Sequence, residues 1–259
     1  MLDLLESQVA RRHLDVRIGG LPMRFYFADD GLHAPACSRY NAYRASSSRV
    51  FPIHLRPPSE RAAFPAQFSY EFEGAQLFCA EDQALFSGVR HEYAFDSLLR
   101  IFLSWSLPPR AGFLLHAATV VRDGRAYVFT GHSGAGKSTV ASLSPRGSVL
   151  TDEISLLSFE EGVWRAHGTP FWGEFRAAGS NTSAPIAGIF SLVQAGRHRV
   201  RPMRPAAALR TLLSNVLFFS SDSSATRRLL ELLAKAADGM ASYELEFQRD
   251  PGFWEVLPS

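Results

Sequence analysis

Apolar and polar positions alternate over short stretches in the first third of the chain, a pattern typical of β-strands. Gly-Gly, Asp-Asp-Gly and Pro-Pro turn signals separate these stretches. One pair of strands forms a hairpin about Gly74, and Pro52 restricts its own strand to a sheet edge. The strands and the hairpin expected here cover residues 14–18, 23–27, 50–55, 68–78 and 88–93.

Two further segments complete a β-rich N-terminal part, which we delimit as residues 1–94. Apolar residues recur on one face over residues 1–12, so a short helix is predicted there. Residues 37–49 are polar and include three consecutive serines, so they predict a loop.

Helical and strand patterns alternate in the second part of the chain, residues 95–259. Asp96 is a suitable N-cap for the first helix, and Gly239 suits the end of a later one. The expected helices cover residues 96–107, 138–143, 205–219, 225–237 and 251–256. The expected strands cover residues 113–121, 125–130, 147–157, 163–167, 186–193 and 242–247. The whole pattern predicts an α/β protein with a mixed β-sheet and a helical C-terminal region.

A glycine-rich segment follows the predicted strand 125–130 and matches the phosphate-loop pattern G-x-x-x-x-G-K-[ST]. An Asp-Gly turn joins this strand to the preceding one, so an antiparallel hairpin leads into the segment. Glycines let backbone N–H groups surround phosphate oxygens, and the following helix adds its positive dipole end. We expect Lys137 to reach the β- and γ-phosphates of ATP and Ser138 to bind Mg²⁺. The residues expected to bind the nucleotide are Gly131, His132, Ser133, Gly134, Ala135, Gly136, Lys137, Ser138 and Thr139.

Composition and charge narrow the function classes. Hydrophobic residues make up 46% of 259 residues, enough for a sizeable core, and the net charge of +2 implies no general attraction to nucleic acid or membranes. Cys37 and Cys79 lack metal-site spacing, so we expect free thiols in a reducing cytoplasm. We also expect no signal peptide and no membrane span, because no stretch approaches ~20 apolar residues.

Several polar residues are candidates for metal binding and proton transfer. Asp152 and Glu153 are adjacent on the predicted strand 147–157; one acid can bind Mg²⁺ while the other faces an acceptor hydroxyl, or both are surface turn residues. Glu174 closes an aromatic loop, either as a metal or substrate ligand or as a solvated turn residue. His116 lies in an apolar strand, where most histidines are core residues. Arginines that can supply transition-state charge are Arg176, Arg197, Arg199 and Arg201.

Four segments, in this order, resemble the HPr kinase/phosphorylase-like P-loop kinases, whose catalytic fold is related to that of phosphoenolpyruvate carboxykinase. The segments are residues 115–117 (Leu-His-Ala), 131–139, 151–153 (Thr-Asp-Glu) and 168–170 (Gly-Thr-Pro). The resemblance implies a carboxykinase-like P-loop core. The N-terminal part is more similar to the β-rich leader of short stand-alone relatives found beside peptide-modification genes.

The resemblance also implies roles for individual residues. His116 would lie near the active site, Asp152 would act as the base toward the acceptor hydroxyl, and Glu153 would bind the metal. The family normally has Asp-Asp here, so the longer Glu153 would place the metal differently. Family members often form oligomers, so a homo-oligomer is compatible with the resemblance, although no subunit number follows.

Together these observations predict a Mg²⁺-dependent kinase that uses ATP to phosphorylate a serine-type hydroxyl on a protein, a peptide or free serine. Lys137 would neutralise developing charge, and Asp152 would take the hydroxyl proton. The alternative is an ATP-binding regulator that transfers no phosphate and tolerates the loss of Asp152. A carboxykinase reaction is less favoured, since no set of basic residues for an oxaloacetate-like diacid is recognisable.

Overall fold

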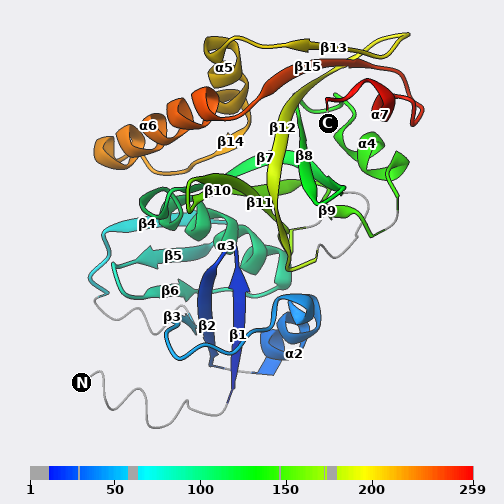
Figure 1. Cartoon of the computed structure of the whole chain (residues 1–259). Helices are drawn as coiled ribbons and strands as arrows, with labels where there is room; N and C mark the ends of the chain where they lie inside the picture. Colours follow the sequence, from blue (N-terminus) through cyan, green and yellow to red (C-terminus); the bar gives the residue numbers. More distant parts are fainter. Residues whose placement is uncertain are drawn as a thin grey trace. The chain divides into compact units, whose positions relative to one another are not determined.

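The chain forms two compact units, Met1–Leu103 and Ser104–Ser259, each with its own mixed sheet (Figure 1). The computed structural model describes residues 12–28, 30–57, 64–145, 147–171, 173 and 180–258. The helix predicted over residues 1–12, together with Glu174 and Arg176, lies outside these ranges. No described helix is both long enough and apolar enough to cross a membrane.

In its described residues, the first unit contains a six-stranded sheet in the order β1-β2-β3-β6-β5-β4. The β1–β2 and β4–β5 pairs are antiparallel hairpins, whereas β3 runs parallel to β2 and β6. Helix α3 begins in this unit and ends in the second. The elements are β1 (His13–Ile18), β2 (Leu21–Phe27), α2 (Asp30–Arg39), η1 (Asn41–Tyr43), β3 (Phe51–Arg56), β4 (Phe68–Phe72), β5 (Ala75–Cys79), β6 (Ala84–Ser87) and α3 (Glu92–Ser106).

Aromatic residues of α3 pack against the sheet of the first unit. The ring centroids of Phe95 and Phe25 are 5.1 Å apart, as are those of Phe102 and Phe51. Both helical rings also contact Phe86. Because each of these rings is buried, they supply much of the apolar area that holds helix and sheet together.

The structure confirms the strands predicted over residues 14–18 and 23–27 and the hairpin about Gly74. The strand that contains Pro52, β3, was predicted at a sheet edge, and this prediction is wrong. β3 lies between β2 and β6. Pro52 is its second residue, and pairing with β6 begins only at Ile53. The missing N–H of proline is therefore tolerated at the start of an internal strand.

The loop predicted over residues 37–49 is confirmed only in part, and the strand predicted over residues 88–93 is wrong. Residues 37–49 include the end of α2 and the short helix η1; α2 contains Pro35 and shows no apolar stripe that could have identified it. Residues 88–93 form no strand, because β6 ends at Ser87 and α3 starts at Glu92. The expected free thiols are found, with Cys79 buried and Cys37 half-buried.

Asp96 is not the N-cap of α3, since the helix begins at Glu92. The His91 ring nitrogen Nδ1 instead accepts a hydrogen bond from the backbone N–H of Ala94 at 3.2 Å. The Asp96 carboxylate is buried, where Arg39 Nε donates to it at 2.9 Å and the Tyr40 hydroxyl also donates to it. The acid is thus the centre of a buried polar group that links α2 to α3.

We expect Asp96→Ala to lower the free energy of unfolding by about 3–5 kcal/mol, because Arg39 would lose its ion pair with the buried carboxylate and the buried Tyr40 hydroxyl would lose its acceptor. Asp15→Ala is the matched control: it removes the more exposed pair with Arg24 and should cost only about 1 kcal/mol. Denaturant unfolding of both variants tests this. Equal losses of unfolding free energy in the two variants would show that the buried pair stabilises the protein no more than the exposed pair does.

The second unit contains, in the part of the chain described, a nine-stranded sheet whose main order is β11-β10-β7-β8-β12-β15-β13. The short strands β9 and β14 also pair with β7, and β11 pairs with the start of β12. The elements that follow α3 are η3 (Pro108–Arg110), β7 (Gly112–Arg122), β8 (Arg125–Thr130), α4 (Lys137–Leu143), β9 (Val149–Thr151), β10 (Ile154–Glu160), β11 (Val163–His167), β12 (Ser183–Gln194), β13 (Arg199–Pro202), α5 (Pro205–Asn215), β14 (Val216–Leu217), α6 (Ser223–Gly239), β15 (Ser242–Phe247) and α7 (Phe253–Val256).

Two apolar clusters cover the opposite faces of this sheet. On one face, Ala117 and Val128 pack with residues of α5 and α6, such as Leu212 and Leu233. On the other face, Val120 and Phe129 pack with Val140 of α4 and Phe253 of α7. Because neighbouring strand residues face opposite sides, these clusters identify the face of every β7 and β8 side chain.

Most predicted elements of this unit are confirmed, with three differences. Residues 147–157 form two strands, β9 and β10, separated at Asp152 and Glu153. The helix predicted over 205–219 ends at Asn215, where β14 begins. Strand β13 was not predicted, because its arginine-rich sequence lacks apolar alternation.

Candidate functional site

The glycine-rich segment forms a tight turn between β8 and α4. Gly131, Gly134 and Gly136 have φ angles of 150°, 80° and 112°, which L side chains rarely adopt. A Cβ at Gly131 would lie 3.0 Å from that of Ala135, and one at Gly136 would overlap the ring of Phe247. The conformation of the turn therefore depends on glycine at these positions.

Lys137, the first residue of α4, folds its side chain back over this turn. Its Nζ donates hydrogen bonds to the carbonyl oxygens of Gly131 at 2.9 Å and His132 at 3.1 Å. Burial lowers the pKa of Lys137 from its ordinary value. The ammonium group is thus held inside the curve of the loop, where phosphate oxygens would be attracted to it.

Strand β7 brings the turn and the paired acids close together. Ala117 lies opposite Thr130, the last residue of β8, and its N–H donates to the carbonyl of Glu153 at 3.0 Å. Since strands are spaced about 4.8 Å apart, the backbones of Thr130 and Glu153 are roughly 10 Å apart. His116, opposite Ile154, lies on the strand between them.

The paired acids occupy the short break between β9 and β10. Thr151 lies opposite Thr119 and Ile154 opposite His116, so the register is the same on both sides of the break. The two acids therefore lie in a bend beside the stretch of β7 that carries His116 and Ala117.

Asp152 is buried, at 3% exposure, and one of its carboxylate oxygens accepts a hydrogen bond from the N–H of Gly173 at 3.0 Å. A Cβ at Gly173 would lie 3.0 Å from Asp152 Oδ2 and 3.2 Å from Glu153 Cβ. The chain after β11 therefore passes directly over both acids. A larger residue at this position would require Asp152 and Glu153 to shift by a few tenths of an ångström.

A buried group of hydroxyl side chains beside the acids was missed by the sequence analysis. Thr119 Oγ1 and Ser155 Oγ are 2.6 Å apart, and Ser155 donates to the carbonyl of Ala117 at 2.9 Å. Thr151 donates to the carbonyl of Ile154 at 3.0 Å. The signal in the sequence that could have identified this group is the presence of hydroxyl residues at otherwise apolar strand positions. The hydrogen bonds of these hydroxyl groups fix the backbone that carries the two acids.

Ser158, His167 and Glu160 form a second polar cluster farther along β10 and β11. Ser158 Oγ is 2.7 Å from His167 Nε2 and 2.7 Å from Glu160 Oε1. Glu160 Oε1 also lies 3.0 Å from the same histidine nitrogen. A hydrolytic triad needs the acid on the other ring nitrogen, so this cluster is structural.

The described residues contain no group of three or more His, Cys, Asp or Glu side chains able to hold a metal by themselves. Mg²⁺ does not require such a group, because it is commonly held by one or two carboxylates together with substrate phosphates and water. The Ser138 hydroxyl and the two acids are oxygen donors of the right kind. The donor set thus fits Mg²⁺ only in combination with a phosphate.

Comparison with known proteins identifies the family of the chain. The family model described as "SynChlorMet cassette protein ScmC" matches residues 95–257, more than half of the chain. The chain belongs to this family. No curated protein sequence matches it.

One solved structure that aligns with the chain is titled "Structure of the Hpr(Ser) kinase/phosphatase from Coxiella burnetii". The alignment covers 52% of this chain and 85% of that chain, with 14% sequence identity and a TM-score of 0.31. A TM-score this low does not establish a shared fold.

We expect Gly136→Ala to destabilise the protein by about 3 kcal/mol, because strain at positive φ adds to overlap with Phe247. That ring is buried and contacts Phe253, so it cannot move aside freely. Gly134→Ala is the control: no atom lies within 4 Å of its Cβ position, so only strain of about 1 kcal/mol is expected. Thermal unfolding compares the two, and equal losses would contradict the packing argument.

Proposed function

We propose that this protein is a Mg²⁺-dependent kinase that transfers phosphate from ATP to a serine-type hydroxyl, with residues 95–259 as its P-loop catalytic domain. One observation carries the proposal. In support of it, the strand that leads into the phosphate-loop sequence and the segment that carries the buried Asp152 lie on either side of β7, where Ala117 lies opposite Thr130 and donates to the carbonyl of Glu153. Nucleotide binding alone requires the loop, whereas phosphoryl transfer also requires a group that positions the acceptor hydroxyl.

The loop residues 131–139 bind the phosphates in this proposal. Backbone N–H groups of the turn and of the first turn of α4 point to the bound oxygens. The Lys137 ammonium, held on the carbonyls of Gly131 and His132, needs only a small rearrangement to meet them. ATP supplies the transferable phosphoryl group, and Mg²⁺ neutralises charge that develops on it.

Asp152 accepts the proton of the acceptor hydroxyl as the hydroxyl oxygen bonds to phosphorus. The Gly173 N–H that fixes one carboxylate oxygen supports this role. His116, which lies on β7 beside the acids, would lie near the transferred phosphate. Ser138 and Glu153 are the proposed metal ligands, and Glu174 is a further proposed ligand.

The acceptor is a serine-type hydroxyl of a protein, a peptide or free serine. Assembly as a homo-oligomer and action in the cytoplasm complete the proposal. The contrasting function is an ATP-binding regulator without phosphoryl transfer, in which Asp152 would serve only to hold Gly173.

Asp152→Asn should reduce phosphate transfer about 10²–10⁴-fold, the usual contribution of a positioned base, while ATP binding persists. The assay incubates the protein with γ-labelled ATP and Mg²⁺, with and without free serine and an extract of the source cells. Label is then followed into small molecules, peptides and proteins. An unchanged transfer rate would remove Asp152 from the proposed role.

Two controls make the result specific. Asp123→Asn changes the same chemical group in the exposed β7–β8 turn, where φ is 51°, so transfer should be unaffected. Lys137→Ala should weaken both ATP binding and transfer, because it removes the cation of the loop. Tight ATP binding with no labelled acceptor would favour the regulator instead.

A further inference from the structure

Strands β12 and β15 end beside the proposed phosphate loop, residues 131–139. β12 runs parallel to both β8 and β15, and its Ser191 lies opposite Thr130, the residue before the loop. β12 continues beyond that level to Gln194, which lies opposite Phe247, the last residue of β15. The carboxyl ends of the three strands therefore lie at one edge of the sheet, where open α/β sheets commonly bind their ligands.

Two of the loop glycines are held in place by packing. The Cβ position of Gly131 lies 3.0 Å from Ala135 Cβ and 3.6 Å from the carbonyl oxygen of Leu192 in β12. The Cβ position of Gly136 overlaps the ring of Phe247 in β15. The backbone and side chains around these two glycines therefore fix the two ends of the loop.

Gly134, between them, lacks such packing. Its φ is 80° and no atom lies within 4 Å of its Cβ position, so the surroundings do not restrict it sterically. Its carbonyl oxygen instead accepts a hydrogen bond of 2.6 Å from the side-chain amide of Gln194. The other side of the same peptide is the N–H of Ala135, which donates to the carbonyl oxygen of His132 at 3.1 Å. Because a peptide unit is planar, the two bonds together fix its orientation.

We propose that Gln194 is a positioning residue of the phosphate site, which holds the Gly134–Ala135 peptide of the loop in its phosphate-binding orientation. The inference rests on the proposed nucleotide site and adds to it a residue from outside the loop. A segment that is already fixed in the free protein loses less conformational entropy when the ligand binds. Since Gln194 is exposed, its contribution is to the loop and not to the core.

The experiment measures the affinity of the full chain for ATP and for inorganic triphosphate, each with Mg²⁺, by calorimetry. Gln194→Ala should weaken both about three- to ten-fold, the effect of losing one hydrogen bond. Because the two compounds share only the phosphate chain, equal factors place the effect at the loop. Unchanged affinities would overturn the proposal. So would a loss confined to ATP, which would place Gln194 against the nucleoside.

Gln248→Ala is the matched control. Gln248 is also exposed and directly follows β15, but its amide donates to Asp250 Oδ2 at 2.5 Å and not to the loop. Its loss should leave both affinities unchanged, and an equal loss in the two glutamine variants would contradict a specific role. Gln194→Ala should also keep the melting temperature within about 2 °C of the wild type. A larger fall would show that Gln194 supports the fold instead.

Steady-state transfer gives an independent readout. Gln194→Ala should raise KM for ATP by the same factor and leave kcat nearly unchanged, because the hydrogen bond acts in the bound and the transition states alike. A lower kcat at unchanged KM would overturn the proposal. If the wild type binds ATP but transfers no phosphate, the kinase is refuted and the two affinities still decide the role of Gln194. A wild type that binds neither compound would overturn both.

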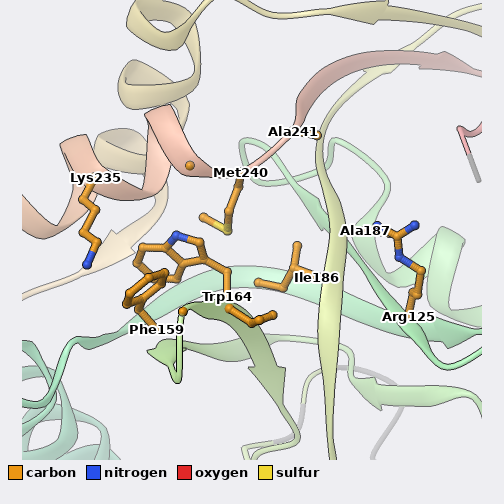
Figure 2. Close-up of a pocket in the computed structure, with 11 residues that line it drawn as sticks. Arg125, Phe159, Trp164, Ile186, Ala187, Lys235, Met240 and Ala241 are labelled. Carbon is orange, nitrogen blue, oxygen red and sulfur yellow. The ribbon is translucent and has the colours of Figure 1, made fainter.

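A cavity of about 520 Å³ near the start of β12 supplies the last control (Figure 2). Ile186, which lines it, is roughly 25 Å along the strand from Gln194. Trp164 is buried there, and Lys235 Nζ covers the ring of Phe159, 3.6 Å from its centroid. Lys235→Met should leave both affinities unchanged. A ten-fold loss in this variant would place the phosphates at the cavity and overturn the assignment.

Discussion

The pairing of β7 with its neighbours is the constraint on which the candidate site depends. Within the described chain, this strand pairs with β8, β9, β10 and β14, so its register determines where the phosphate-loop sequence and the acids lie. A slip of one residue would move every β7 side chain to the opposite face. Ala117 and Val120 are buried in different clusters, and their alternation therefore secures the register.

The sequence predicted much of the second unit because its local signals agree with the tertiary structure. The Asp-Gly turn, the glycine-rich loop and the amphipathic α6 all occur where they were expected. Prediction was poorer where distant contacts decide. Asp96 has the chemistry of a helix cap, but its carboxylate is buried and accepts a hydrogen bond from Arg39. Pro52 is tolerated in an internal strand because the pairing of β3 with β6 begins only at the next residue, Ile53. Neither contact is visible along the chain.

In the candidate site, too, local features could be predicted from the sequence, whereas contacts between distant segments could not. The identities of the loop residues follow from the spacing, whereas the position of Asp152 beside β7 follows only from the cross-strand register. The contact of Gly173 with both acids, and of Gly136 with Phe247, joins segments far apart in sequence.

The most direct measurement is a crystal structure of the wild-type protein with Mg²⁺ and a non-hydrolysable ATP analogue. The account predicts that the γ-phosphate lies beside Lys137 on the α4 face, with the Asp152 carboxylate about 6 Å from its phosphorus, enough for one hydroxyl between them. Phosphates bound outside the loop would contradict it. So would a γ-phosphate in the loop but separated from Asp152 by other protein atoms.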